Sequence, residues 1–184
     1  LDMHPGVIGR ALFLDRIVNV VDEGIDVAIR IGHLPDSSHS AIRVGTVRRV
    51  VCAAPAYLEK YGAPETPADL AGHRIIAATS AWSSLDWRFG SDEKIAVTVR
   101  PQLFCSTYEG VLAAATDGWG VARPVAYQIA PALVAGHLRT VLNNYEPDPL
   151  PVHVIHPEGR RASAKVRTFV DMAVQRLRAN RLIN

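Results

Sequence analysis

Short apolar segments alternate with segments of helical periodicity along the chain, and polar or glycine-containing turns separate them. Apolar runs bounded by turn residues favour strands, whereas apolar positions three or four residues apart favour helices. The alternation of the two predicts an α/β fold. The expected strands are 10–14, 26–31, 41–54, 75–78, 85–89, 94–99, 102–105, 121–122, 137–142 and 152–155, and the expected helices are 16–23, 55–61, 106–118, 124–136 and one from Ser163.

Residues suited to helix ends mark several of these helices. Asp15 is suited to cap the helix 16–23, and Gly24 to stop it. Proline suits the first position of the helices at Pro55 and Pro124. The run 106–109, Ser-Thr-Tyr-Glu, matches a capping box and predicts a helix start there. The last helix carries apolar residues at helical spacing: Val166, Phe169, Val170, Ala173, Val174 and Leu177.

Two proline-rich connectors bracket the middle of the chain. They are 62–72 (GAPETPADLAG), in which Asp69 and Leu70 can form one helical turn, and 146–151 (EPDPLP). Two crossings of this kind predict two lobes, with 1–73 and 150–184 in the first and 74–149 in the second. A cleft between two lobes is a common place for a small ligand.

Composition narrows the class of protein. The 184 residues are 48% hydrophobic and 21% charged, as in ordinary globular domains. The net charge of +2 is too small to predict a nucleic-acid surface. No apolar run approaches the ~20 residues that span a bilayer, and no export signal opens the chain. Cys52 and Cys105 lie in apolar segments and are interpreted as buried, reduced thiols, which favours the cytoplasm; a disulfide is the alternative.

The sequence contains no recognisable catalytic constellation. It has no G-x-S-x-G, phosphate-binding glycine loop, H-E-x-x-H or C-x-x-C. His153 and His156 are spaced so that on a strand their side chains point to opposite faces, which argues against a shared metal ion. We therefore expect no enzyme activity, no cofactor and no metal.

Six phrases, in order and at matching spacing, carry a family resemblance. They are EGIDVAIRIGHLPDSS (23–38), VRRVVCAAPAYLEKYGAPETPADLAGHR (47–74), WRFG (87–90), GWGVARP (118–124), GHLRTVL (136–142) and SAKVRTFVDMA (163–173). Together they resemble the effector-binding domain of LysR-type transcriptional regulators over almost the whole chain.

The resemblance implies two Rossmann-like lobes of the type II periplasmic-binding-protein kind, with a small metabolite, often an organic acid, in the interlobe cleft. It also implies a homodimer or tetramer, in which the first helix and the helix over 109–117 take part. The family binds DNA through an N-terminal winged helix-turn-helix, which precedes the region matched here. The family's first strand, central in the first lobe, is also missing from the sequence, so we expect unpaired backbone and low stability in that lobe.

Four stretches are candidate effector-binding residues. Ser106 and Thr107 begin a helix, where unpaired N–H groups and the helix dipole favour an anion; the alternative is a cap that only stabilises the helix. Thr79, Ser80 and Ala81 follow a strand, as ligand-binding residues do in open α/β sheets, or form a plain polar turn.

The other two stretches rest more on the resemblance. Ile31 and Gly32 end a strand where glycine lets the backbone approach a ligand; the alternative is a turn glycine. Arg123, followed by Pro124, can pair with a carboxylate, or it is a surface arginine near a helix start.

The sequence therefore predicts the effector-sensing domain of a LysR-type regulator. Its ligand is expected to be a small organic acid, DNA contact is expected only outside this segment, and no membrane contact is expected. The alternative is a solute-binding protein of a transporter with a similar fold. An enzyme using the same cleft would need a nucleophile or an acid–base pair, and none is evident.

Overall fold

A computed structural model describes residues 4–15, 18–20, 22–34, 39–79, 84–157 and 163–183. The chain divides into two compact units, Leu1–Gly45 with Pro151–Asn184, and Thr46–Leu150. Residues 46–73, which the connector composition places in the first lobe, group with the second unit. The reason is strand pairing: β3 (Val51–Ala53) pairs with β8 (Arg139–Val141), which lies in the second unit.

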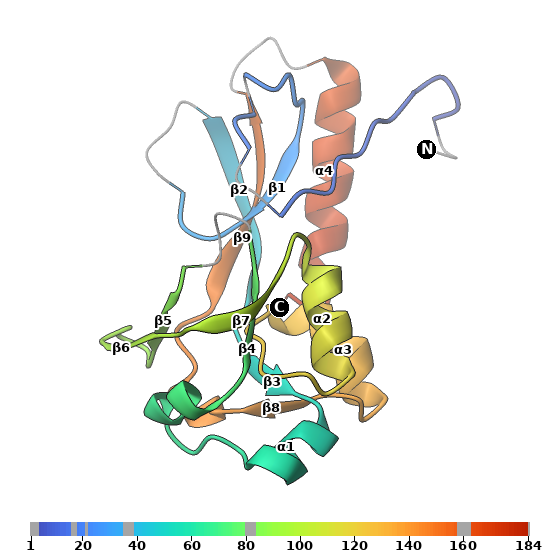
Figure 1. The fold of residues 1–184 in the computed structure, drawn as a ribbon. Helices are drawn as coiled ribbons and strands as arrows, with labels where there is room; N and C mark the ends of the chain where they lie inside the picture. Colours follow the sequence, from blue (N-terminus) through green and yellow to red (C-terminus); the bar gives the residue numbers. More distant parts are fainter. Residues whose placement is uncertain are drawn as a thin grey trace. The chain divides into compact units, whose positions relative to one another are not determined.

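Unit 1 contains a three-stranded sheet and the last helix. The strands are β1 (Ala28–Ile31), β2 (His39–Val47) and β9 (Leu150–Pro157), in the order β1-β9-β2 (Figure 1). β1 runs antiparallel to β9, from the pair Ala28–Ile155 to the pair Ile31–Val152. The helix α4 (Ala164–Arg178) begins after Ser163, whose Oγ accepts the N–H of Val166 at 3.3 Å.

The N-terminal part of unit 1 differs from the sequence prediction. Residues 10–14 form no strand, and Leu12, Phe13 and Leu14 are exposed. A strand needs a partner for its backbone groups, and no ladder reaches this segment among the described residues. The predicted helix 16–23 includes residues outside the described set, and its described residues are turn or irregular.

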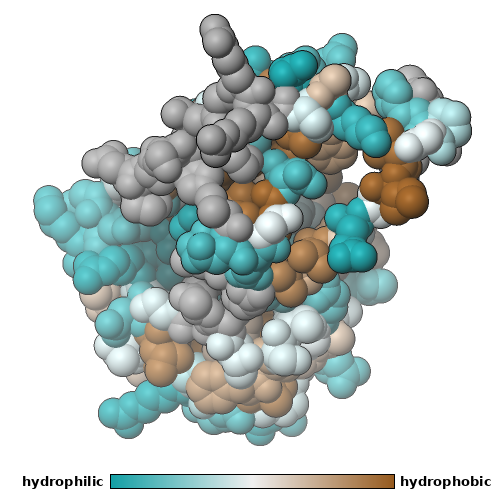
Figure 2. All heavy atoms as spheres, turned by 90° about the horizontal axis from the view of Figure 1, so that it is seen from above, coloured by the Kyte–Doolittle hydropathy of each residue, from teal (hydrophilic) through white to brown (hydrophobic). Residues whose placement is uncertain are grey.

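The apolar stripe of α4 is less buried than its periodicity predicts. Val170 is buried, but Phe169 is 48% exposed. Apolar side chains also reach the surface in the view of Figure 2, where brown areas interrupt the hydrophilic surface. Among the exposed apolar residues of unit 1 are Ile8 and Phe13. No helix in the described parts of the chain has the length and apolar character needed to cross a bilayer.

Unit 2 is built on a layer of short strands joined through residues 121 and 122. β4 (Ile75–Ala78) runs parallel to β7 (Pro101–Cys105), and β5 (Asp86–Phe89) forms an antiparallel hairpin with β6 (Ile95–Thr98). Ala122 bridges to Cys52 of β3, and Val121 bridges to Ile75 of β4. The predicted strand at 121–122 thus exists as a two-residue link between β3 and β4.

Within this layer β3 and β4 are buried on both faces, which explains why they are continuous in apolar residues, whereas β5, β6 and β7 carry exposed residues. Alternate side chains point to opposite faces. Val51 and Ala53 belong to a core cluster with α1 (Pro55–Tyr61), the 3-10 helix η1 (Pro67–Gly72) and the hairpin β5–β6. Val50 and Cys52 belong to a second cluster under α2 (Tyr108–Thr116) and α3 (Ala126–Val134), which lie on one side of the layer in Figure 1.

Turn and cap residues account for most element ends in unit 2. Pro55 opens α1 and Gly62, with φ of 82°, follows its last residue, as predicted. The expected helical turn at Asp69 is η1, whose cap Thr66 donates its N–H to the Asp69 carboxylate at 2.8 Å. The predicted strand 41–54 is divided into β2 and β3, and α3 begins two residues after Pro124. A second 3-10 helix, η2 (Asn143–Tyr145), precedes the connector 146–151.

Candidate functional site

The parallel pairing of β4 and β7 brings two of the predicted hydroxyl residues to one edge of unit 2. Thr79 follows β4 directly, and its N–H donates to the carbonyl oxygen of Cys105, the last residue of β7, at 2.8 Å. Ser106 and Thr107 come next in the chain and lead into α2. Thr79, Ser106 and Thr107 are all exposed, so this carboxyl edge is open to solvent. Ser80 and Ala81 lie outside the described residues.

Thr107, not Ser106, caps α2. Its Oγ1 accepts the N–H of Gly110 at 3.3 Å, and its φ and ψ of −131° and 156° are those of an N-cap residue. The predicted capping box is therefore wrong, because Glu109 occupies the second helical position and Gly110 the third. The correction moves the helix start by one residue, and Thr107 stays at the carboxyl edge.

Gly110 allows α2 to lie close against the end of β7. A Cβ built on Gly110 would meet Cβ of Cys105 at 3.2 Å, which is tighter than ordinary contact. Cys105 is half-buried and Cys52 is buried, and neither forms a disulfide. The expectation of two reduced thiols is confirmed, but only Cys52 is fully buried. Burial raises the pKa of the Cys52 thiol to about 12.

Arg123 lies in the same unit and is held by several contacts. Its guanidinium lies 5.6 Å from the ring centre of Trp87 and 4.9 Å from that of Phe89, and it donates to the carbonyl oxygen of Arg88. Burial, with a smaller contribution from the charge of Arg49, lowers the pKa of Arg123 to about 10, while Glu93 and Tyr108 oppose the shift. Arg123 therefore stays charged at neutral pH.

The remaining candidates are engaged in backbone contacts. The carbonyl oxygen of Pro124 accepts the N–H of Val50 at 3.0 Å. Ile31 pairs with Val152 in unit 1, and the N–H of Gly32 donates to Pro151 at 2.8 Å. Gly32 has φ of 114°, which favours glycine at this strand end. Ile31 and Gly32 belong to unit 1, whereas Thr79, Thr107, Arg123 and Pro124 belong to unit 2.

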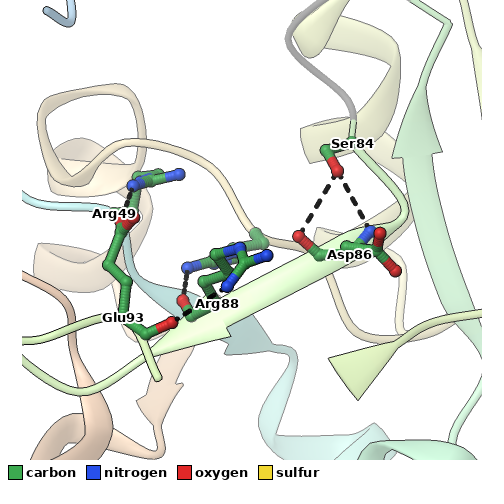
Figure 3. Close-up of polar contacts among 6 residues, drawn as sticks. Arg49, Ser84, Asp86, Arg88 and Glu93 are labelled. Atoms are coloured by element: carbon green, nitrogen blue, oxygen red, sulfur yellow. Dashed lines mark hydrogen bonds and ion pairs between the residues drawn. The ribbon is translucent and has the colours of Figure 1, made fainter. Parts of the chain in front are cut away.

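Two residues beside Arg123 were missed by the sequence analysis. Arg49 precedes β3, and Glu93 lies in the turn between β5 and β6, 44 positions later. Their side chains point toward one another in Figure 3, and Nη2 of Arg49 lies 2.5 Å from Oε1 of Glu93. The pairing follows from the fold rather than from local spacing. The run of two arginines at 48 and 49, within an otherwise apolar segment, is the signal that could have indicated it.

Neither a metal-binding cluster nor a hollow marks the carboxyl edge of β4 and β7 among the described residues. Within the described ranges, no group of three or more His, Cys, Asp or Glu side chains is placed to hold a metal ion. Two hollows lie in unit 1, both beside Ile42 and α4, and the larger is lined by Asp171, Gln175 and Arg178 among others.

Comparison with known proteins identifies the family. Residues 3–178 match the family model described as the LysR substrate binding domain. The chain belongs to this family. It is 30% identical over 182 residues to the HTH-type transcriptional regulator YhjC of Escherichia coli K12, covering 92% of this chain and 58% of that protein. It is 32% identical over 173 residues to the HTH-type transcriptional activator AaeR of the same organism, covering 93% and 56%.

Solved structures agree with this assignment. The regulatory domain of CrgA, a LysR-type regulator from Neisseria meningitidis, matches with a TM-score of 0.75 and 25% identity, covering 85% of this chain and 78% of that one. The effector domain of AmpR from Pseudomonas aeruginosa matches in fold, with a TM-score of 0.69 and 22% identity over 90% and 78%. The fold is therefore the two-lobed, type II periplasmic-binding-protein-like fold of LysR regulatory domains.

The family assignment decides between the functional alternatives. The chain is a LysR substrate-binding domain, and these named relatives are transcriptional regulators. It is thus a domain of a regulator family and not an enzyme, and the alternative of a transporter's solute-binding protein is set aside. The chain spans a little over half the length of these two relatives, 58% and 56%.

Proposed function

We propose that this domain senses a small organic anion for a transcriptional regulator, and that the anion binds at the carboxyl edge of β4 and β7. The observation that carries the proposal is the hydrogen bond from the Thr79 N–H to the Cys105 carbonyl at 2.8 Å. It holds the end of one strand beside the start of α2, so that hydroxyls from two segments meet at one exposed edge. Open α/β sheets commonly bind ligands at such edges.

The chemistry of the edge favours an anion over a neutral ligand. The first N–H groups of a helix lack intrahelical partners, and the helix dipole adds partial positive charge. Thr107 and Thr79 supply hydroxyl groups that can donate to a carboxylate. Arg123, in the same unit, adds a positive charge at neutral pH. Ser80, Ala81 and Pro124, next to these residues in the chain, complete the proposed ligand contacts in unit 2.

The family supports a wider role for the domain. Ile31 and Gly32 of unit 1 are proposed as further effector contacts on the resemblance alone. We propose that the full-length protein binds DNA through a separate N-terminal domain, works as a homodimer or tetramer, and acts in the cytoplasm. An effector controls such a protein only if it binds one arrangement of the protein more tightly than another.

A pair of cap variants tests the position of the site. Thr107→Ala and Ser163→Ala each remove one helix cap with the same type of hydrogen bond, at 3.3 Å in both cases. Each is expected to lower the free energy of unfolding by about 1 kcal/mol. Calorimetric titration with an organic acid that stabilises the unsubstituted domain should show affinity reduced by about tenfold, or 1.4 kcal/mol, in Thr107→Ala only.

Ser163→Ala is the matched control because its helix lies in unit 1. Equal affinity in the two folded variants would show that the start of α2 does not bind the acid.

A further inference from the structure

Three segments of unit 2 bring a group of basic side chains together around one acid. Arg49 precedes β3, Glu93 lies in the β5–β6 turn, and Arg123 follows the link at 121–122. Glu93 pairs with Arg49 at 2.5 Å, and its backbone carbonyl accepts Nη1 of Arg88 at 3.3 Å (Figure 3). Arg123 donates to the carbonyl oxygen of Arg88. The three arginines are thus connected through short contacts, but only Arg49 pairs with the carboxylate of Glu93, while Arg88 and Arg123 donate to backbone carbonyls.

The hydrogen bonds of this group leave two donors unused. The Nε atoms of Arg49 and Arg123 are buried and have no hydrogen-bond partner within the described residues. No carboxylate of the described residues lies within ion-pair distance of Arg123. A planar carboxylate is bound most strongly when a guanidinium offers two parallel N–H groups. Arg49 and Arg123 each use one Nη2 donor in these contacts and keep Nε, so neither makes the two-point contact that its geometry permits.

Charge also is incompletely balanced here. Arg49 and Arg123 are partly buried, whereas Arg88 is exposed, and the one carboxylate that pairs with either buried arginine among the described residues is that of Glu93. One positive charge is therefore left without a carboxylate in a partly buried place, which is costly unless an anion is bound. The nearby acids in the hairpin are used elsewhere, since Asp92 pairs with Lys94 at 2.9 Å and Asp86 accepts from the Thr98 hydroxyl at 2.5 Å. The excess charge therefore has no second protein carboxylate to neutralise it among the described residues.

The conformation and exposure of Glu93 allow another carboxylate to replace it as the ion-pair partner of Arg49. Its φ of 51° lies in the left-handed region, which is unfavourable for a residue other than glycine. Its side chain is 42% exposed, so the ion pair with Arg49 faces water on one side. Such pairs contribute little to stability. A ligand carboxylate can compete with that of Glu93 for Arg49, whose Nε has no hydrogen-bond partner among the described residues.

We propose that Arg49 and Arg123 form a carboxylate-binding subsite for the effector, and that Glu93 occupies it until a carboxylate displaces it. The inference rests on the proposed function for its ligand class. It adds that the Glu93 carboxylate competes with the ligand for Arg49. The effector's carboxylate takes up the unused Nε donors, and the Glu93 side chain gives up its contact with Arg49. Binding of the ligand is thereby coupled to the ion pair that joins the β5–β6 turn to Arg49.

Two variants of adjacent residues in the same turn test the proposal. Glu93→Gln removes the competing carboxylate, and Asp92→Asn removes one charge from the neighbouring residue, which pairs only with the exposed Lys94. The probe is sodium acetate, compared with sodium chloride at equal ionic strength, and the readout is thermal unfolding. Glu93→Gln should reach half-maximal stabilisation by acetate at a concentration about fivefold lower than the unsubstituted domain needs.

Asp92→Asn should respond to acetate as the unsubstituted domain does. Adding Arg49→Met to Glu93→Gln should abolish the gain. Equal acetate responses of Glu93→Gln and Asp92→Asn, or no acetate response beyond chloride in Glu93→Gln, would overturn the inference. The proposed function fails separately, through unchanged acid affinity in Thr107→Ala.

Discussion

A Cβ atom built on Gly120 would lie 2.5 Å from the carbonyl oxygen of Arg74. This close approach lets residues 121–122 pair with β4. The Val121 N–H donates to the same Arg74 oxygen at 2.8 Å, and the Ile76 N–H donates to the carbonyl oxygen of Val121 at 2.9 Å. A backbone carbonyl in a sheet cannot move aside cheaply, so the position requires glycine.

Gly120→Ala is therefore expected to lower the free energy of unfolding by about 2 kcal/mol, as overpacking of a tight interior does. Gly72→Ala is the control, because a Cβ there meets nothing within 4 Å. That change should stay within about 0.5 kcal/mol of the unsubstituted domain, as surface substitutions usually do. Urea unfolding measures both values, and equal stability of the two variants would refute the packing argument.

The two thiols should differ in reactivity. Cys52 is buried and its pKa is raised to about 12 by burial, so it has almost no thiolate at neutral pH. Cys105 is only half-buried. Iodoacetamide at neutral pH should label Cys105 in the folded domain and should label Cys52 only after unfolding. Mass spectrometry of the labelled peptides checks this, and early labelling of Cys52 would show that its strand is more open than described.

Local signals in the sequence predicted the elements of unit 2 well. Proline and glycine at the ends of α1, and the continuous apolar run Ile75–Ala78, fix these elements by short-range chemistry, and the structure has them as expected. The prediction of a strand at 10–14 was wrong because a strand depends on a partner, and a short apolar run alone does not supply one.

Contacts between residues far apart in the chain could not be predicted from local sequence patterns. The helix start at Thr107 was expected within one residue, but the choice between Ser106 and Thr107 depends on how β7 ends. The pair Arg49–Glu93 could not be predicted, because its members lie 44 residues apart and meet only when the hairpin folds back toward β3. The family resemblance supplied the overall fold class, which periodicity limited only to α/β.

His73 should make stability depend on pH. Burial lowers the pKa of its imidazole below the ordinary value of 6.5, and Asp69 only partly opposes this. Tyr57 Oη lies 3.2 Å from Nδ1 of His73 and accepts the N–H of Arg74 at 3.0 Å. A neutral His73 with its proton on Nε2 can accept the Tyr57 hydroxyl proton at Nδ1. Because the folded pKa is depressed, the unfolded chain takes up the proton first, and stability is lost as pH falls below about 6.5.

The comparison variant for this effect is His73→Asn. The stability advantage of the unsubstituted domain over this variant should be full above pH 6.5 and should shrink as the pH falls, down to the depressed pKa of the folded state. Thermal or urea unfolding across that range measures it. An advantage that stays constant with pH would mean that His73 is not held neutral by the fold.

The most direct test of the central claim is thermal unfolding of the domain in a panel of small carboxylic acids, each paired with its neutral amide. A ligand at 100 times its dissociation constant stabilises the folded state by roughly 2.7 kcal/mol. For a chain of this length that corresponds to a rise in Tm of about 5–10 °C. We predict such a rise with at least one acid and none with its amide. Equal shifts with acid and amide, or none with any acid, would contradict a sensor of organic anions.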